Sequence, residues 1–109
     1  MFLMTLIAPA YAQTAPVKDF QKLNGSDIRR AFAGHEFGDG VHFNFRYRPN
    51  GSLEGMSMGK KVARKWRIAG DTLCATDVSG EICYAVWKKG VDIRLYPGGS
   101  NISVDGMLR

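Results

Sequence analysis

The sequence predicts a mainly β fold: an antiparallel up-and-down meander of about seven strands that closes into a small barrel, preceded by one short N-terminal helix. After Gly34, apolar and polar side chains alternate in short runs, the pattern of half-buried strands. Turns containing glycine separate these runs, and 13 of the 109 residues are glycine. Sequential hairpins favour closure because a closed barrel has no exposed edges. A two-sheet sandwich is the alternative.

The first twelve residues are apolar and uncharged, and they end in Ala10-Tyr11-Ala12, a cleavage motif of secretory signal peptides. We predict a signal peptide over 1–12, a leader over 13–22 and a single β domain over 23–109. The basic residues that usually open a signal peptide are missing, so the segment is truncated or the true start codon lies upstream. The alternative is a hydrophobic first strand, which Pro9 and Pro16 disfavour. The segment is too short to span a bilayer, and an exported chain is periplasmic or secreted.

One helix is expected over Leu23–Gly34. Asn24 is a suitable N-cap, and Asp27 follows three residues later as a short capping-box partner. Leu23 and Ile28 then occupy the positions of a hydrophobic staple, and Gly34 ends the helix. About three helical turns are not stable alone. The face that carries Ile28 and Phe32 is therefore expected to dock on the sheet.

The clearest strand is Val41–Arg48, where one face carries Val41, Phe43, Phe45 and Tyr47. In the strand expected over Lys60–Ile68, Trp66 and Ile68 point inward. The remaining strands are expected over Ser52–Met58, Thr72–Thr76, Glu81–Lys88, Val91–Tyr96 (with Val91 inward) and Asn101–Asp105.

The two cysteines lie on opposite arms of one predicted hairpin, whose turn is Asp77-Val78-Ser79-Gly80. Centring that turn places Cys74 opposite Cys83, within reach of a disulfide bond. The alternative is a pair of free buried thiols. A zinc site is disfavoured, because two cysteines nine residues apart without a nearby histidine pair lack the usual ligand spacing. A disulfide agrees with export, because such bonds persist in the periplasm or outside the cell.

The formal charge is +5, and five cations gather in eight residues. This stretch is the candidate anion-binding site: Lys60, Lys61, Arg64, Lys65 and Arg67. Such a cluster can bind the phosphate or carboxylate groups of an anionic envelope lipid or glycan, or a periplasmic protein, and nucleic acid is not favoured. The alternative is a solvated outer face that keeps a small exported protein in solution.

The sequence supports neither catalysis nor a cofactor. No serine lies in a nucleophile-elbow setting, and no phosphate loop or dinucleotide fingerprint is present. His35 and His42 flank a turn with two carboxylates, but His42 falls on the polar face of a strand, so no metal site is predicted. The aromatic side chains are expected to fill the barrel. An apolar-ligand carrier would need an enclosed cavity of roughly 300 Å³ or more.

The order of features resembles that of small exported proteins of Gram-negative bacteria whose function is uncharacterised. The residues that carry the resemblance are Gly34, Phe45–Tyr47, Asn50-Gly51, Trp66, Gly70–Cys74 and Cys83. The resemblance implies a calycin-like (lipocalin-like) β fold and a periplasmic location, and it transfers no catalytic residue. The chain is also loosely similar to small periplasmic lysozyme inhibitors. Lysozymes are strongly cationic, however, and would repel a chain of charge +5.

We therefore expect a non-enzymatic exported envelope protein that binds an anionic lipid, a glycan or a protein partner. The alternatives are an inhibitor or chaperone-like partner of a periplasmic enzyme, and a carrier of a small apolar ligand.

Overall fold

The computed structural model describes residues 18–109. The predicted signal peptide (1–12) and the first residues of the predicted leader (13–17) lie outside this range. Among the described residues, no helix is both long and apolar enough to span a membrane. In chain order the elements are β1 (Gln21–Lys22), α1 (Gly25–Phe32), β2 (His35–Gly38), β3 (Phe43–Tyr47), β4 (Ser52–Ser57), β5 (Lys60–Ala69), β6 (Thr72–Asp77), β7 (Gly80–Lys89), β8 (Asp92–Pro97) and β9 (Val104–Leu108).

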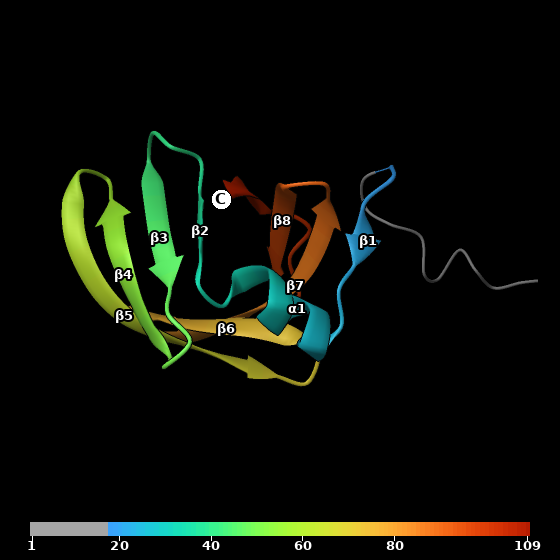
Figure 1. Cartoon of the computed structure of the whole chain (residues 1–109), viewed down its shortest axis with the longest axis horizontal. Coiled ribbons are helices and arrows are strands. Elements are labelled where there is room, and N and C mark those ends of the chain that lie inside the picture. The colour runs from blue at the N-terminus through green and yellow to red at the C-terminus, as the bar shows by residue number, and fades with distance from the viewer. Residues whose placement is uncertain (1–17) are drawn as a thin grey trace, which may run out of the picture.

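The strands form a closed up-and-down barrel (Figure 1). Each strand from β2 to β8 pairs antiparallel with the next in sequence, and β9 pairs back with β2. The predicted meander and its closure are confirmed, with eight strands in the ring. The short β1 lies outside the ring and pairs with the second half of β7, at Trp87 and Lys88.

Three strands differ from the prediction, and the first is the short β1, which was not predicted. The strand β2 was not predicted, although it pairs with both β3 and β9 and completes the ring. The last strand covers Val104–Leu108 instead of the predicted Asn101–Asp105. A glycine at position 106 usually indicates a turn. Here a Cβ at Gly106 would lie 2.8 Å from the carbonyl oxygen of Gly38, so the close approach of β9 to β2 requires glycine.

The predicted inward position of Val41 was wrong, and its side chain is 82% exposed. The Asp39 carboxylate accepts hydrogen bonds from the backbone N–H groups of Val41, His42 and Phe43. These bonds hold a turn, so the strand begins at Phe43. Val91 is likewise exposed, because it lies in the turn between β7 and β8.

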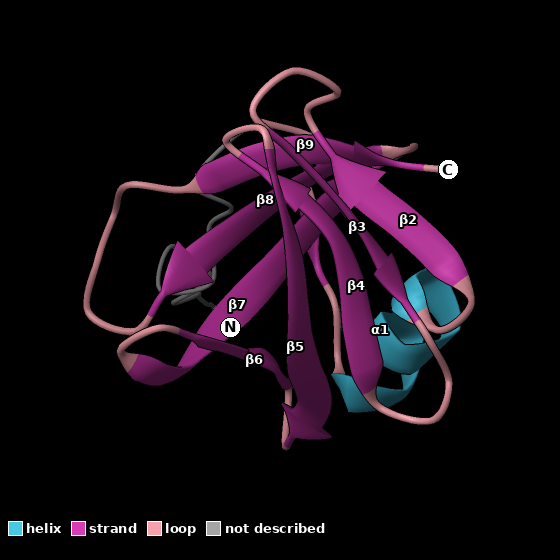
Figure 2. Cartoon of the chain, turned by 90° about the vertical axis from the view of Figure 1, so that its left-hand side faces the viewer, coloured by secondary structure: helices cyan, strands magenta, loops and turns pink. Residues whose placement is uncertain are grey.

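The helix α1 closes one end of the barrel (Figure 2). Its predicted N-cap is confirmed, because the Asn24 side chain accepts a hydrogen bond of 2.9 Å from the N–H of Asp27. Ile28 and Phe32 are fully buried. The Phe32 ring packs edge-on against Tyr47, with ring centroids 5.0 Å apart. The helix therefore seals this end with apolar side chains.

Strand β4 passes unusually close to β3 at Gly55. A Cβ at this position would lie 2.0 Å from the carbonyl oxygen of Asn44, closer than any side chain permits. Glycine lets the strand bend here, as small barrels require.

Candidate functional site at the open end of the barrel

The two ends of the barrel differ. In an up-and-down barrel, alternate connections lie at the same end. The helix end holds the β5–β6 connection, where Asp71 accepts a hydrogen bond from the N–H of Gly25. The other end, which we call the open end, holds the connections formed by residues 39–42, 58–59, 78–79 and 98–103. Figure 2 shows the β6–β7 and β8–β9 connections on the side away from α1.

A cavity of about 200 Å³ enters the barrel at the open end. Its wall is mainly aromatic and aliphatic and includes Phe43, Phe45, Tyr47, Leu53 and Leu95. At about 30 Å³ for each water molecule in the liquid, this volume corresponds to about seven waters. It is smaller than the roughly 300 Å³ expected of an apolar-ligand carrier.

Arg64 supplies a positively charged side chain to the wall of this cavity. On β5 it has the same parity as the buried Trp66, so its side chain points to the interior. Its guanidinium lies over the Phe45 ring, 5.5 Å from the centroid, in a cation–π arrangement. None of the ion pairs among residues 18–109 includes Arg64. Its charge is thus held against an aromatic ring, and it is close enough to Asp77 to lower the pKa of that carboxylate.

Asp77 and Tyr84 are among the further polar residues that line the cavity. The Asp77 carboxylate accepts hydrogen bonds of 2.7 Å from the hydroxyl and the backbone N–H of Ser79. These bonds lower the pKa of Asp77, and the charge of Arg64 lowers it further. Burial raises the pKa of the Tyr84 phenol, and the Asp77 charge adds to this effect. At neutral pH the cavity therefore presents a guanidinium, a carboxylate occupied by Ser79, and a neutral phenol.

The predicted cation cluster is divided by the alternation of β5. Lys60 and Lys61 are exposed at the start of the strand, next to the open end. Arg64 points inward, whereas Lys65 is exposed on the outer face. Arg67 is also on the outer face and forms an ion pair of 2.6 Å with Glu81. The five cations therefore do not form one basic surface, and only three of them lie near the open end.

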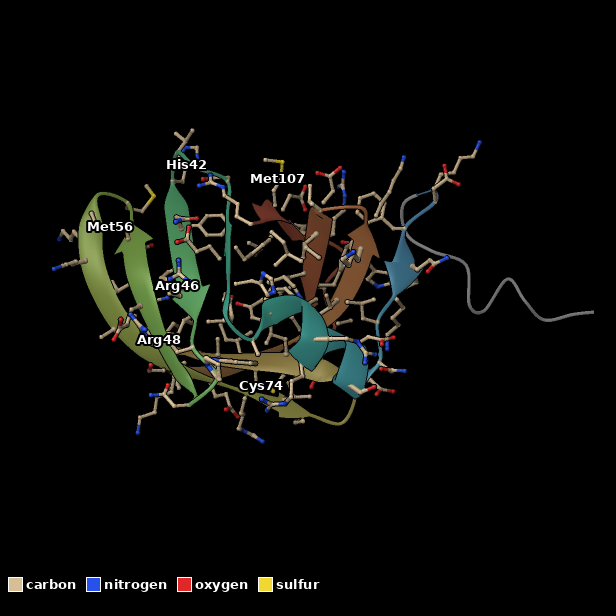
Figure 3. The ribbon with its side chains drawn as sticks, in the orientation of Figure 1. His42, Arg46, Arg48, Met56, Cys74 and Met107 are labelled. Carbon is tan, nitrogen blue, oxygen red and sulfur yellow. A yellow bond between two sulfur atoms is a disulfide. The ribbon has the colours of Figure 1, made fainter. Side chains whose placement is uncertain are left out.

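The largest surface depression lies on the outer face of β2 to β5 and measures about 640 Å³. Figure 3 labels Arg46, Arg48 and Met56, which line it. Both arginines are already paired: Arg46 lies 2.7 Å from a Glu36 oxygen, and Arg48 lies 3.0 Å from a Glu54 oxygen. These two pairs neutralise each other's charges, and Lys61, which also lines the depression, is its one cation outside the ion pairs found among residues 18–109.

The two histidines do not converge. His42 lies in the β2–β3 connection at the open end (Figure 3), and its Nδ1 is 2.8 Å from an Asp39 oxygen. His35 begins β2 next to the helix, and its Nδ1 is 3.2 Å from the carbonyl oxygen of Arg109. The hydrogen bond from the Val41 N–H is the main cause that lowers the pKa of Asp39. The Asp39–His42 pair therefore stabilises its own turn.

The predicted disulfide between Cys74 and Cys83 is confirmed. A Glu81 oxygen lies within 4.8 Å of both sulfurs, which gathers three residues of metal-binding type. The sulfurs are bonded to each other, however, and a metal prefers the thiolate. We assign this group a structural role.

No protein-family model, curated protein or solved structure matches this chain. The small barrel is compatible with the calycin-like fold that the resemblance implies. Function is inferred below from the geometry of the open end, since a fold alone does not identify an activity.

Proposed function

We propose that the chain is a non-enzymatic exported envelope protein that binds an anionic lipid at the open end of its barrel. The anionic group of the lipid enters the cavity and pairs with Arg64, and the acyl segment next to it contacts the aromatic wall. We also propose that the chain belongs with the small exported proteins of Gram-negative bacteria that it resembles. The disulfide supports export, because such bonds persist in oxidising compartments.

The position of Arg64 carries this proposal. A guanidinium beside an aromatic wall is suited to a ligand that is anionic at one end and apolar at the other. The Asp77 carboxylate is a competing anion, but Ser79 binds its Oδ1, and Asp77 forms none of the ion pairs found among residues 18–109. Lys60 and Lys61 add positive charge next to the entrance.

The cavity volume limits the ligand. About 200 Å³ accommodates a short acyl segment, and a whole lipid does not fit. The lipid therefore keeps most of its length outside the barrel, and short fatty acids are suitable probes.

Isothermal titration calorimetry with hexanoate, octanoate and decanoate tests the proposal, at concentrations where each is monomeric. Each added methylene group is worth about 0.8 kcal/mol when buried, which corresponds to about a fourfold lower Kd. We expect this gain until the cavity is full and a plateau thereafter. Octanol is the uncharged comparison.

The decisive variant is Arg64→Met, which removes the charge and keeps most of the side-chain length. We expect it to raise the Kd of octanoate about tenfold or more and to leave octanol binding unchanged. Lys65→Met is the matched control, because it removes a charge from the neighbouring residue on the outer face. Equal octanoate binding by Arg64→Met and the wild type would refute the proposal.

A further inference from the structure

We propose that the open end docks on the surface of an anionic lipid bilayer, with four apolar loop tips in the headgroup layer. This inference rests on the proposed function, because it names the bilayer as the source of the bound lipid.

Each connection at the open end carries one exposed apolar side chain. The exposed fractions are 82% for Val41, 74% for Met58, 100% for Val78 and 77% for Ile102. Among the described residues at the helix end, Val91 is the one comparable side chain in a connection. Highly exposed apolar side chains are therefore concentrated in the connections around the entrance of the cavity.

Met58 has a backbone conformation that methionine rarely adopts, which indicates that its apolar side chain has a role. Met58 and Gly59 form the β4–β5 turn with φ angles of +52° and +80°. This turn favours asparagine or glycine at both positions, and methionine is strained there. The turn thus holds an exposed methionine where a polar residue would be more stable.

The charges around the tips suit an anionic surface. Lys60 and Lys61 follow the Met58–Gly59 turn directly, and neither belongs to an ion pair among residues 18–109. Of the carboxylates near this end, Asp39 and Asp77 accept hydrogen bonds from their own turns. Glu81 and Asp105 form ion pairs with arginines. The lysines can therefore approach lipid phosphates without a competing partner.

A bilayer suits this arrangement better than a second copy or another protein. The apolar tips come from four separate connections, with polar residues such as Ser79 and Asn101 beside them. A stable protein interface needs a continuous surface of about 800 Å² on each partner. Fluid lipid can instead surround each tip separately, and it supplies both apolar chains and negative charge.

Cosedimentation tests the docking, with vesicles of phosphatidylcholine alone and of phosphatidylcholine with 30% phosphatidylglycerol. We expect binding to the anionic vesicles that weakens as salt rises. Met58→Asn combined with Ile102→Ser should weaken this binding at least tenfold, while Val91→Ser at the helix end leaves it unchanged. Asn is favoured at the strained turn position, so Met58→Asn is expected to fold.

A charge-matched pair of variants tests the lysines. Lys60→Gln with Lys61→Gln should weaken binding to anionic vesicles by about thirtyfold, at about 1 kcal/mol for each lysine at the surface. Lys88→Gln with Lys89→Gln removes the same charge from the end of β7 and is expected to have a much smaller effect.

The outcomes separate the two proposals. If Arg64→Met loses octanoate binding and still cosediments, both proposals stand as distinct steps. If the tip variants bind anionic vesicles as well as the wild type, the docking is overturned and octanoate binding is unaffected. If the wild type is a dimer in gel filtration and the tip variants are monomers that still bind vesicles, a second copy is the true occupant and the docking is also overturned.

Discussion

Arg67 on β5 reaches across β6 and donates two hydrogen bonds, of 2.8 and 2.6 Å, to the carboxylate of Glu81 on β7. A Glu81 oxygen lies within 4.8 Å of both sulfurs of the Cys74–Cys83 disulfide. The ion pair and the disulfide thus join three neighbouring strands at one place on the outer face. Figure 3 shows Cys74 on the side of the barrel opposite His42.

Removal of the disulfide should destabilise the barrel. The two cysteines are nine residues apart, and closing a loop of about ten residues is worth about 2–3 kcal/mol in the chain-entropy model. We expect Cys74→Ala with Cys83→Ala to lower the free energy of unfolding by this amount in urea titrations. The wild type treated with a reductant should lose a similar amount of stability. An unchanged urea midpoint would contradict the stabilising role of the disulfide.

The Arg67–Glu81 pair should make stability depend on pH. The hydrogen bonds from Arg67 lower the pKa of Glu81 in the folded state. A glutamate with a lowered folded pKa adds stability above its unfolded pKa of about 4.3, and this contribution is lost as pH falls through the folded value. We expect the stability difference between the wild type and Glu81→Gln to be present at pH 7 and to vanish in acid.

Arg67→Met is the control for this pH dependence, because it removes the same pair from the other side. Its stability deficit should follow the same pH profile in thermal unfolding. A deficit of Glu81→Gln that stays constant from pH 7 to below the folded pKa would show that the carboxylate charge is not the cause.

Gly55→Ala should be strongly destabilising. The added Cβ would lie 2.0 Å from the Asn44 carbonyl oxygen, so β3 and β4 must separate. We expect a loss of about 3 kcal/mol or more, the range of severe overpacking. Gly98→Ala is the matched control, because nothing lies within 4 Å of its Cβ and its φ is not positive. If thermal unfolding shows equal melting temperatures for the two variants, the close approach is not the constraint.

The helix cap offers a milder test. Asn24→Ala removes the acceptor for the Asp27 N–H and should lower the free energy of unfolding by about 1 kcal/mol. Asn24→Asp keeps an acceptor and should lose little. Chemical denaturation monitored by circular dichroism measures both, and equal losses would mean that the side-chain acceptor is not the source of the stability.

The strands of the barrel were predictable where apolar and polar residues alternate over a long segment. Phe45 and Tyr47 are buried on one face of β3 as expected, and Asn24 caps the helix as expected. The strand β2 was not predictable in the same way, because four residues that end in glycine show too few alternations to differ from a turn. Its pairing with β3 and β9 decides its conformation.

The candidate site was predictable only in part. The alternation that places Trp66 inward also places Arg64 inward, so the signal was present in the sequence. The inward position of Arg64 was missed because a dense run of lysine and arginine residues usually forms a solvent-exposed face. The hairpin turn specifies the register of β6 against β7, which is confirmed. The positions of Asp77 and Tyr84 beside Arg64 also depend on the register of β5 against β6 and on closure of the ring, which the sequence does not specify.

The ring closes through β2 and β9, the first and last of its eight strands. In an exported chain that crosses the membrane N-terminus first, β2 emerges early and β9 late, so the ring cannot close until Leu108 is available to pair with Phe37. Until then β2 and the strand last delivered have unpaired edges that can bind other chains. Completion of the fold therefore depends on delivery of the final strand, and a chain arrested before Val104 is expected to aggregate.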